Sequence, residues 1–135
     1  MRWEVIVALE KRKSVLLVDK QPKEIVYLTR QLEMAGFAIS FSRTGAGAIK
    51  KIEECAPDVV LLEVSLSDMD GVDVAKAIRN NPTRSRIPVI AISAFPHMKS
   101  RCLDNGCDAF VQKPIKALDL IAQIRQLIRK PTGTL

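Results

Sequence analysis

The chain has 135 residues, of which 47% are hydrophobic and 27% charged, as is usual for one globular domain. Aromatic residues make up only 4%, which argues against an all-β sandwich and against a surface that stacks the bases of single-stranded nucleic acid. Three cysteines without a CxxC pair and a single histidine offer no zinc-binding pattern. We therefore expect reduced thiols and a cytoplasmic location.

The formal net charge of +6 is unevenly distributed. Residues 1–14 hold four cations and two anions, residues 129–135 hold two cations, and a net charge of +2 is left for the middle of the chain. Since nucleic-acid surfaces concentrate basic side chains on one element, we expect no DNA or RNA partner. The apolar run from Val5 to Leu9 is too short for a signal-peptide core or a membrane span, so we expect no membrane association.

Composition and pattern divide the chain into three parts. We expect residues 1–13 to be an N-terminal extension or linker, residues 14–130 to form the folded domain, and residues 131–135 to be a tail. Apolar residues alternate in the extension, at Trp3, Val5, Val7 and Leu9. This alternation fits a strand, while a helix joined to something upstream stays equally open.

Apolar runs and helical stripes alternate along the domain. The expected strands are residues 14–18, 37–41, 59–63, 87–93 and 109–112. The expected helices are residues 22–35, a segment capped by Thr44, and residues 72–80, 96–105 and 117–129. In the last helix the expected inward stripe is Leu118, Ile121, Ile124 or Arg125, and Ile128. The order predicts an α/β fold, a doubly wound five-stranded parallel sheet with helices on both faces.

A polar residue lies at the carboxyl end of four expected strands. These residues are Asp19, Glu63, Ser93 and Lys113. With the strand order 2-1-3-4-5, the four strands are neighbours, and their ends meet beside the switch point where open α/β sheets place their sites. Two carboxylates, a hydroxyl and an ammonium in one crevice therefore predict a functional site.

Several short motifs resemble the receiver domains of two-component response regulators, over about residues 14–130. The motifs are Leu16-Leu17-Val18-Asp19, Asp68-Met69-Asp70-Gly71, Ser93-Ala94, Gly106-Cys107-Asp108-Ala109 and Lys113-Pro114. The resemblance implies a flavodoxin-like receiver fold with strand order 2-1-3-4-5 and five helices. It also implies an aspartate at the end of the third strand that accepts a phosphoryl group from a histidine kinase, and two acids after the first strand that hold Mg²⁺.

The resemblance assigns roles to matching positions in this chain. Ser93 and Lys113 would contact the phosphoryl group, Phe110 would be the aromatic that moves inward on activation, and Lys113-Pro114 would be a cis peptide. The implied partners are a histidine kinase, a phosphotransfer protein or an effector protein; a homodimer stays open, and no enzymatic activity is expected. The family's usual exchange surface would present Lys99, Arg101, Gln112 and Arg125.

Two positions depart from the family pattern. Glu63 stands at the phosphoacceptor position in place of an aspartate, and Lys20 replaces the second acid beside Asp19. Because Mg²⁺ prefers several oxygen ligands, we expect no metal, or only weak Mg²⁺ binding through Asp19 and Glu63, and no other cofactor. We expect the ammonium of Lys20 to fill the vacated space and to pair with Asp19 or Glu63.

The longer side chain of Glu63 can reach toward Lys113 and resemble part of a phosphoaspartate in charge and position. We therefore hypothesise a pseudo-receiver, a domain that stays in one conformation and signals through protein contacts without phosphorylation. Whether it would mimic the active or the inactive state is left open. Two alternatives are a conventional receiver phosphorylated on Asp68 or Asp70, and a small flavodoxin-like ligand-binding domain, although no glycine-rich phosphate loop follows the first strand.

Overall fold

The computed structural model of the chain describes residues 2–5 and 12–129. The strands are β1 (Ser14–Val18), β2 (Ala38–Ser42), β3 (Val59–Glu63), β4 (Val89–Ser93) and β5 (Ala109–Gln112). The α-helices of the domain are α2 (Val26–Met34), α3 (Gly45–Cys55), α4 (Gly71–Asn80), α5 (Lys99–Asp104) and α6 (Ala117–Arg129). Short 3₁₀ helices, η1 (Pro22–Ile25) and η2 (Pro96–Met98), precede α2 and α5.

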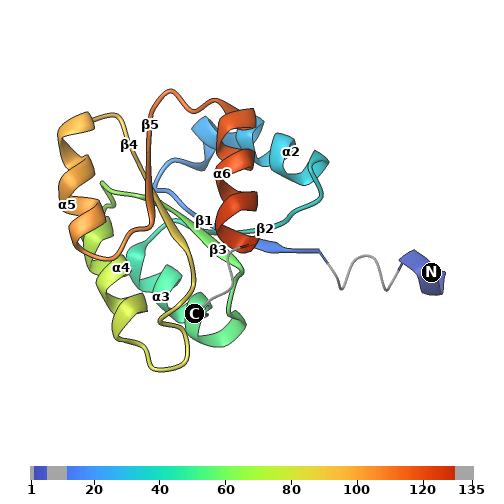
Figure 1. Cartoon of the computed structure of the whole chain (residues 1–135), viewed down its shortest axis with the longest axis horizontal. Coiled ribbons are helices and arrows are strands. Elements are labelled where there is room, and N and C mark those ends of the chain that lie inside the picture. The colour runs from blue at the N-terminus through green and yellow to red at the C-terminus, as the bar shows by residue number, and fades with distance from the viewer. Residues whose placement is uncertain (1, 6–11, 130–135) are drawn as a thin grey trace.

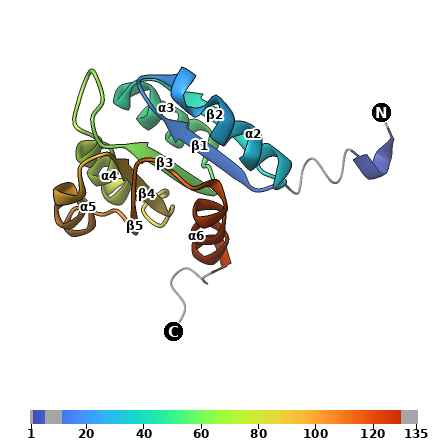
Figure 2. The same cartoon turned by 90° about the horizontal axis from the view of Figure 1, so that it is seen from above.

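The five strands form one parallel sheet in the order β2-β1-β3-β4-β5. Figures 1 and 2 show α2 and α6 on one face of this sheet and α3, α4 and α5 on the other. In the register, Val18 of β1 pairs with Leu62 of β3, and Glu63 pairs with Ile92 of β4. The predicted doubly wound α/β fold, with the strand order 2-1-3-4-5 and the helices between the strands, is confirmed.

The core consists of two hydrophobic layers, one on each face of the sheet. Successive side chains of a strand point to opposite faces, so Leu16 and Val18 pack under α3, α4 and α5, whereas Val15 and Leu17 pack under α2 and α6. All five residues of β3 are buried, because β3 is central and helices cover both of its faces. The strand that ends in Glu63 is therefore fixed from every side.

The structure corrects two details of the predicted helices. The predicted helix over residues 22–35 begins with the 3₁₀ turn η1. In α6, Leu118 is 80% exposed, whereas Leu120 is fully buried together with Ile121 and Ile124, so the prediction that Leu118 points inward was wrong. Positions i, i+1 and i+4 lie on one face of a helix, and Leu120 begins this set.

The two ends of the chain fall largely outside the described residues. Residues 3–5 are helical, but residues 6–11, on which the choice between a strand and a helix for the extension depends, lie outside the described residues. The expected tail over residues 131–135 lies outside them as well. In the part of the chain that the structure describes, no helix combines the length and the apolar character needed to cross a membrane.

Candidate functional site

The strand ends form the site at the carboxyl edge of the sheet. Asp19, Glu63 and Ser93 are buried there, with 5%, 7% and 3% of their surface exposed. Lys113 follows β5, and its side chain is 26% exposed. Parallel pairing of β1, β3, β4 and β5 brings these residues to one edge. The rigid sheet thus positions a buried carboxylate beside a partly accessible ammonium.

Glu63 and Lys113 form an ion pair, in which Glu63 Oε2 lies 2.7 Å from Lys113 Nζ. Oε2 is buried and accepts no well-aligned hydrogen bond. The contact is therefore mainly an electrostatic attraction between the carboxylate and the ammonium. An uncompensated buried carboxylate costs several kcal/mol. The ammonium of Lys113 compensates this charge.

Ser93 connects the end of β4 to two neighbouring segments. Its hydroxyl oxygen accepts a hydrogen bond from the backbone N–H of Phe95 at 3.0 Å, and its carbonyl oxygen accepts one from the N–H of Lys113 at 2.9 Å. The peptide bond between Lys113 and Pro114 is cis. In this conformation the Ser93 hydroxyl orders the turn that leads into η2.

Asp19 and Lys20 make contacts within loops. Asp19 Oδ1 accepts a hydrogen bond from the N–H of Gln21 at 2.8 Å. This bond forms a local turn that is typical of aspartate. Lys20 Nζ donates to Ser65 Oγ at 3.3 Å. The expectation that Lys20 pairs with Asp19 or Glu63 was therefore wrong. Lys20 instead contacts Ser65, while Asp19 accepts a hydrogen bond from its own loop and Glu63 pairs with Lys113.

The donor set at this edge differs from a cluster of acids, because Lys20 stands beside Asp19. An ammonium, that of Lys20, stands where the family has a second acid, and the charge of Glu63 is already balanced by Lys113. Among residues 2–5 and 12–129, no three His, Cys, Asp or Glu side chains are grouped so that they could hold a metal ion. Mg²⁺ prefers near-octahedral coordination by several oxygens, and the carboxylates at this edge are those of Asp19 and Glu63.

Phe110, the expected switch aromatic, is partly buried. It lies on β5 opposite Ala91 of β4 and packs, partly buried, against the hydrophobic layer under α3, α4 and α5.

Asp68 caps a helix that is distant in sequence. Its carboxylate accepts hydrogen bonds from the backbone N–H groups of Gly45 at 2.9 Å and Ala46 at 3.0 Å, which are otherwise unpaired donors at the start of α3. These hydrogen bonds lower the pKa of the Asp68 carboxyl below its ordinary value of 3.8. Asp68 is thus part of the junction between α3 and the loop before α4.

Asp70 and Gly71 fix the start of α4. Asp70 Oδ1 accepts from the N–H of Val72 at 2.9 Å, and Oδ2 lies 2.6 Å from a guanidinium nitrogen of Arg101. A Cβ atom on Gly71 would lie 2.4 Å from the carbonyl oxygen of Glu63. Only glycine therefore lets α4 begin this close to the end of β3.

Two contacts near the site escaped sequence reasoning. Ser65 Oγ accepts a hydrogen bond from Lys20 Nζ, although the two residues are 45 positions apart. Arg101, in a helix later in the chain, forms an ion pair with Asp70. No local pattern identifies either contact. The helix-cap role of Asp70, by contrast, is visible in the Asp-Gly pair that precedes an amphipathic segment.

Comparisons with known proteins give one consistent result. Residues 15–125 match the family model of the response regulator receiver domain. The transcriptional regulatory protein KdpE of Mycobacterium tuberculosis is 36% identical over 121 residues, which cover 88% of this chain and 52% of KdpE. This chain thus spans about half the length of the first curated relatives that it matches. The polar-differentiation response regulator DivK of Brucella ovis is 28% identical, with 86% of this chain and 96% of DivK covered.

Solved structures of response regulator and receiver domains resemble this chain as well. The receiver domain of the sensor histidine kinase PA1611 from Pseudomonas aeruginosa, described with a magnesium ion coordinated in its active site cleft, has a TM-score of 0.82 and 25% identity. The match covers 88% of this chain and 99% of that one. The chemotaxis response regulator CheY4 of Vibrio cholerae has a TM-score of 0.80 at 21% identity, with 87% of this chain and 99% of that chain covered, which is a likeness of fold.

Proposed function

Because this chain belongs to the family of response regulator receiver domains, we propose that it acts in two-component signalling as a pseudo-receiver, which contacts its partners without being phosphorylated. The ion pair of 2.7 Å between Glu63 and Lys113 is the main support. In the family, the matching lysine pairs with the phosphoryl group. Glu63 supplies a permanent negative charge at that position.

The chemistry of the site supports the same proposal. Transfer of a phosphoryl group requires positive charge on the transferring oxygens and an in-line nucleophile, and the donor set around Asp19 and Lys20 does not suit Mg²⁺. Glu63 also extends one methylene farther than an aspartate. Misplacement of a reacting group on the order of 1 Å can cost about a hundredfold in rate.

The proposal extends to the switch aromatic, Phe110. Phe110 packs, partly buried, against the hydrophobic layer under α3, α4 and α5, and the switch aromatic of the family moves inward on activation. The Ser93 hydroxyl accepts a hydrogen bond from the Phe95 N–H. We therefore propose that Glu63 favours the active-like position of Phe110. A histidine kinase, a phosphotransfer protein or an effector protein in the cytoplasm would recognise this conformation.

The two alternatives receive less support. Both carboxylates proposed as substitute acceptors are engaged, Asp68 at the start of α3 and Asp70 at the start of α4 and with Arg101. Phosphorylation of either would remove a helix cap. Membership in the receiver family argues against a flavodoxin-like ligand-binding domain.

A phosphorylation assay tests the proposal. The chain is incubated with Mg²⁺ and acetyl phosphate, and its intact mass is measured. We expect no stoichiometric gain. The matched control is the double variant Lys20→Asp/Glu63→Asp, which restores both acids of the family pattern and is expected to gain one phosphoryl group under the same conditions.

The site of any modification decides between the alternatives. A phosphoryl group mapped to Glu63 in the unaltered chain would contradict the pseudo-receiver. A phosphoryl group mapped to Asp68 or Asp70 would instead establish a conventional receiver with a displaced acceptor.

A further inference from the structure

Two adjoining cavities lie at the amino ends of the strands, on the edge of the sheet opposite Glu63. The first, of about 360 Å³, lies between the segment before β1, the turn after α2 and the last turns of α6. The second, of about 270 Å³, shares Lys13 and Ile128 with the first and extends to the turn before β4. Six cations line the two cavities and define what we call the basic face: Arg12, Lys13, Arg84, Arg86, Arg125 and Arg129.

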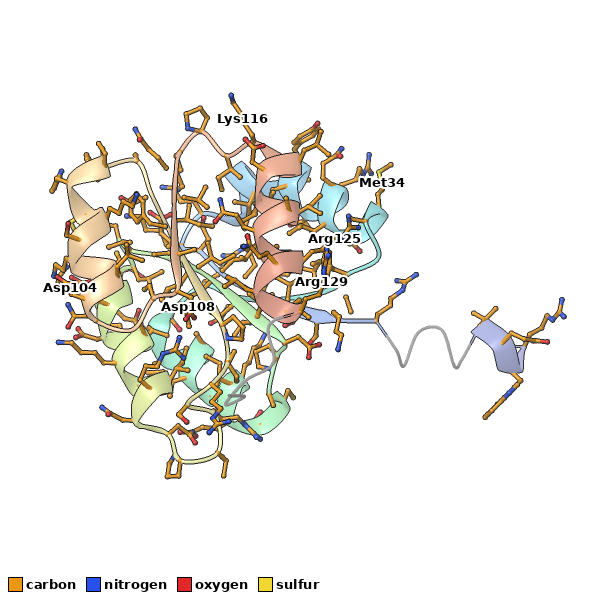
Figure 3. All side chains as sticks on the ribbon, in the orientation of Figure 1. Met34, Asp104, Asp108, Lys116, Arg125 and Arg129 are labelled. Carbon is orange, nitrogen blue, oxygen red and sulfur yellow. The ribbon has the colours of Figure 1, made fainter. Side chains whose placement is uncertain are left out.

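The basic face unites segments that are far apart in the sequence. Figure 3 shows Arg125 and Arg129 on neighbouring turns of α6, close to the chain that enters β1. Arg12 and Lys13 precede β1 and line the same cavity as these two arginines. The charge count along the sequence assigned Arg12, Lys13 and Arg129 to separate ends of the chain, but folding brings them together.

The charges of the basic face are not neutralised by acidic side chains. Among the residues that the structure describes, none of the six cations has a carboxylate within ion-pair distance. One carboxylate, that of Asp58, lines the second cavity, and it accepts hydrogen bonds from the N–H and the hydroxyl of Ser14. The face therefore carries a large excess of positive charge.

The carboxyl ends of nearby helices balance only part of this positive charge. Arg84 donates to the carbonyl oxygens of Ile52 and Glu53 at the end of α3, and Arg125 donates to that of Ala35 after α2. Arg129 lies in the last turn of α6. Each helix carboxyl terminus acts as about half a negative charge, so three termini balance a small share of six full charges.

The surroundings of the cations favour a polyanion over a folded protein partner. Protein interfaces concentrate their binding energy in well-packed anchors, chiefly Trp, Tyr and Arg. Here the arginines have no exposed aromatic or aliphatic anchor beside them, since none of the large exposed hydrophobic residues lines either cavity. Phe37, the aromatic residue in the lining, is 5% exposed, so it offers no surface on which an unpaired base could stack. Duplex nucleic acid keeps its bases stacked, so binding needs no stacking surface, and it carries closely spaced phosphates along its outside.

We propose that the basic face binds the phosphate backbone of duplex DNA without reading its base sequence. Arginine dominates the face, and its planar guanidinium matches phosphate oxygens with two hydrogen bonds. The row of cations across two adjoining cavities suits a ligand that carries closely spaced charges along its length. This proposal is independent of whether Glu63 can be phosphorylated.

Fluorescence anisotropy with two labelled 20-base-pair duplexes of unrelated sequence tests the proposal on the intact chain. We expect equal affinity for both sequences. If all six cations contact phosphates, the logarithm of the binding constant falls with the logarithm of the salt concentration with a slope of about −5. An increase from about 50 to about 200 mM salt then weakens binding about a thousandfold.

Matched variants separate the basic face from net charge. Arg12→Gln/Arg129→Gln removes two cations from the face, and we expect the slope to shrink by about 2 and binding at low salt to weaken about a hundredfold. Lys50→Gln/Lys76→Gln removes the same charge from exposed positions on α3 and α4 and should leave the slope unchanged. Circular dichroism verifies that both variants fold.

Three results would overturn the proposal. One is the absence of duplex binding at low salt, and another is equal weakening by both double variants. The third is binding of poly-L-glutamate as tightly as the duplex, which would assign the face to an acidic protein segment.

Discussion

At the scale of single residues, one additional methylene distinguishes Glu63 from the aspartate of the family. The carboxylate of Glu63 lies 2.7 Å from Lys113 Nζ. Exposed ion pairs contribute about 0–1 kcal/mol, whereas breaking a buried pair leaves an uncompensated charge. The Glu63 side chain is 9% exposed and that of Lys113 26% exposed. The contribution of this pair to stability therefore lies between that of an exposed pair and that of a buried pair.

Replacement of Lys113 tests how much the Glu63–Lys113 ion pair contributes to the free energy of unfolding. Lys113→Met leaves the Glu63 carboxylate buried without a counter-charge, and we expect the free energy of unfolding at neutral pH to fall by about 1–3 kcal/mol. Urea denaturation measures this change. The double variant Glu63→Gln/Lys113→Met removes the stranded charge and should recover most of the loss; a double variant less stable than the single one would contradict the ion pair.

At the scale of elements, the loop between β3 and α4 connects two helices of one layer. Asp68 accepts hydrogen bonds at the start of α3, and Asp70 does so at the start of α4. Backbone N–H groups in the first turn of a helix have no partner within the helix, and a negative charge there is favourable. The loop therefore fixes α3 and α4 relative to the end of β3.

The cap on α3 makes stability depend on pH. Because the hydrogen bonds from Gly45 and Ala46 lower the pKa of Asp68, the folded state takes up this proton less readily than the unfolded state. The carboxylate stabilises the fold above the ordinary value of 3.8, and this contribution is lost as the pH falls through the lowered pKa. We expect Asp68→Asn to be less stable at neutral pH and to lose less stability on acidification.

Urea denaturation across the acidic range measures this difference. Asp104→Asn, at an exposed position at the end of α5, is the matched control and should keep the acid profile of the unaltered chain. Identical acid profiles for both variants would show that Asp68 does not act as a charged cap.

At the scale of the whole molecule, the core is closed over both faces of the sheet, and two of three cysteines lie inside it. Cys102 and Cys107 are buried, while Cys55 is exposed. Burial raises the pKa of Cys107 to about 12 and also raises that of Cys102, because a thiolate loses its hydration there. The raised pKa values keep both buried thiols protonated, and therefore weakly nucleophilic, at neutral pH.

Cysteine alkylation reports how tightly α5 closes the core. The thiolate is the reactive form, so we expect iodoacetamide at about pH 8 to modify Cys55 alone in the folded protein, and all three cysteines in denaturant. Mass spectrometry counts the modified residues. Modification of Cys102 at the rate of Cys55 without denaturant would show that α5 opens far more readily than its packing implies.

The layout of the fold was predictable because buried parallel strands are continuous apolar runs, such as residues 59–62. The meeting of Glu63 and Lys113 followed from strand order together with side-chain length. The contact of Lys20 with Ser65 was not predictable, since it depends on the conformations of two loops. The inward residue of α6 was missed because Leu118 and Leu120 both fit an apolar stripe, and only packing against the sheet chooses between them.

The basic face was hidden for a related reason. Counting charge along the chain treats the two ends as separate, whereas a parallel α/β fold returns the last helix to the start of the first strand. Arg12 and Arg129 thereby line one cavity. Surface electrostatics is a property of the folded molecule, and sequence order alone does not determine it.

The pair between Glu63 and Lys113 also has a consequence for control. A phosphoryl group can be removed by hydrolysis, but the carboxylate of Glu63 is part of the polypeptide and lasts as long as the chain does. If the chain acts as the proposed pseudo-receiver, no phosphatase can end its signal. The occupancy of a partner then follows mass action, so the cell would adjust the response through synthesis and degradation of the protein.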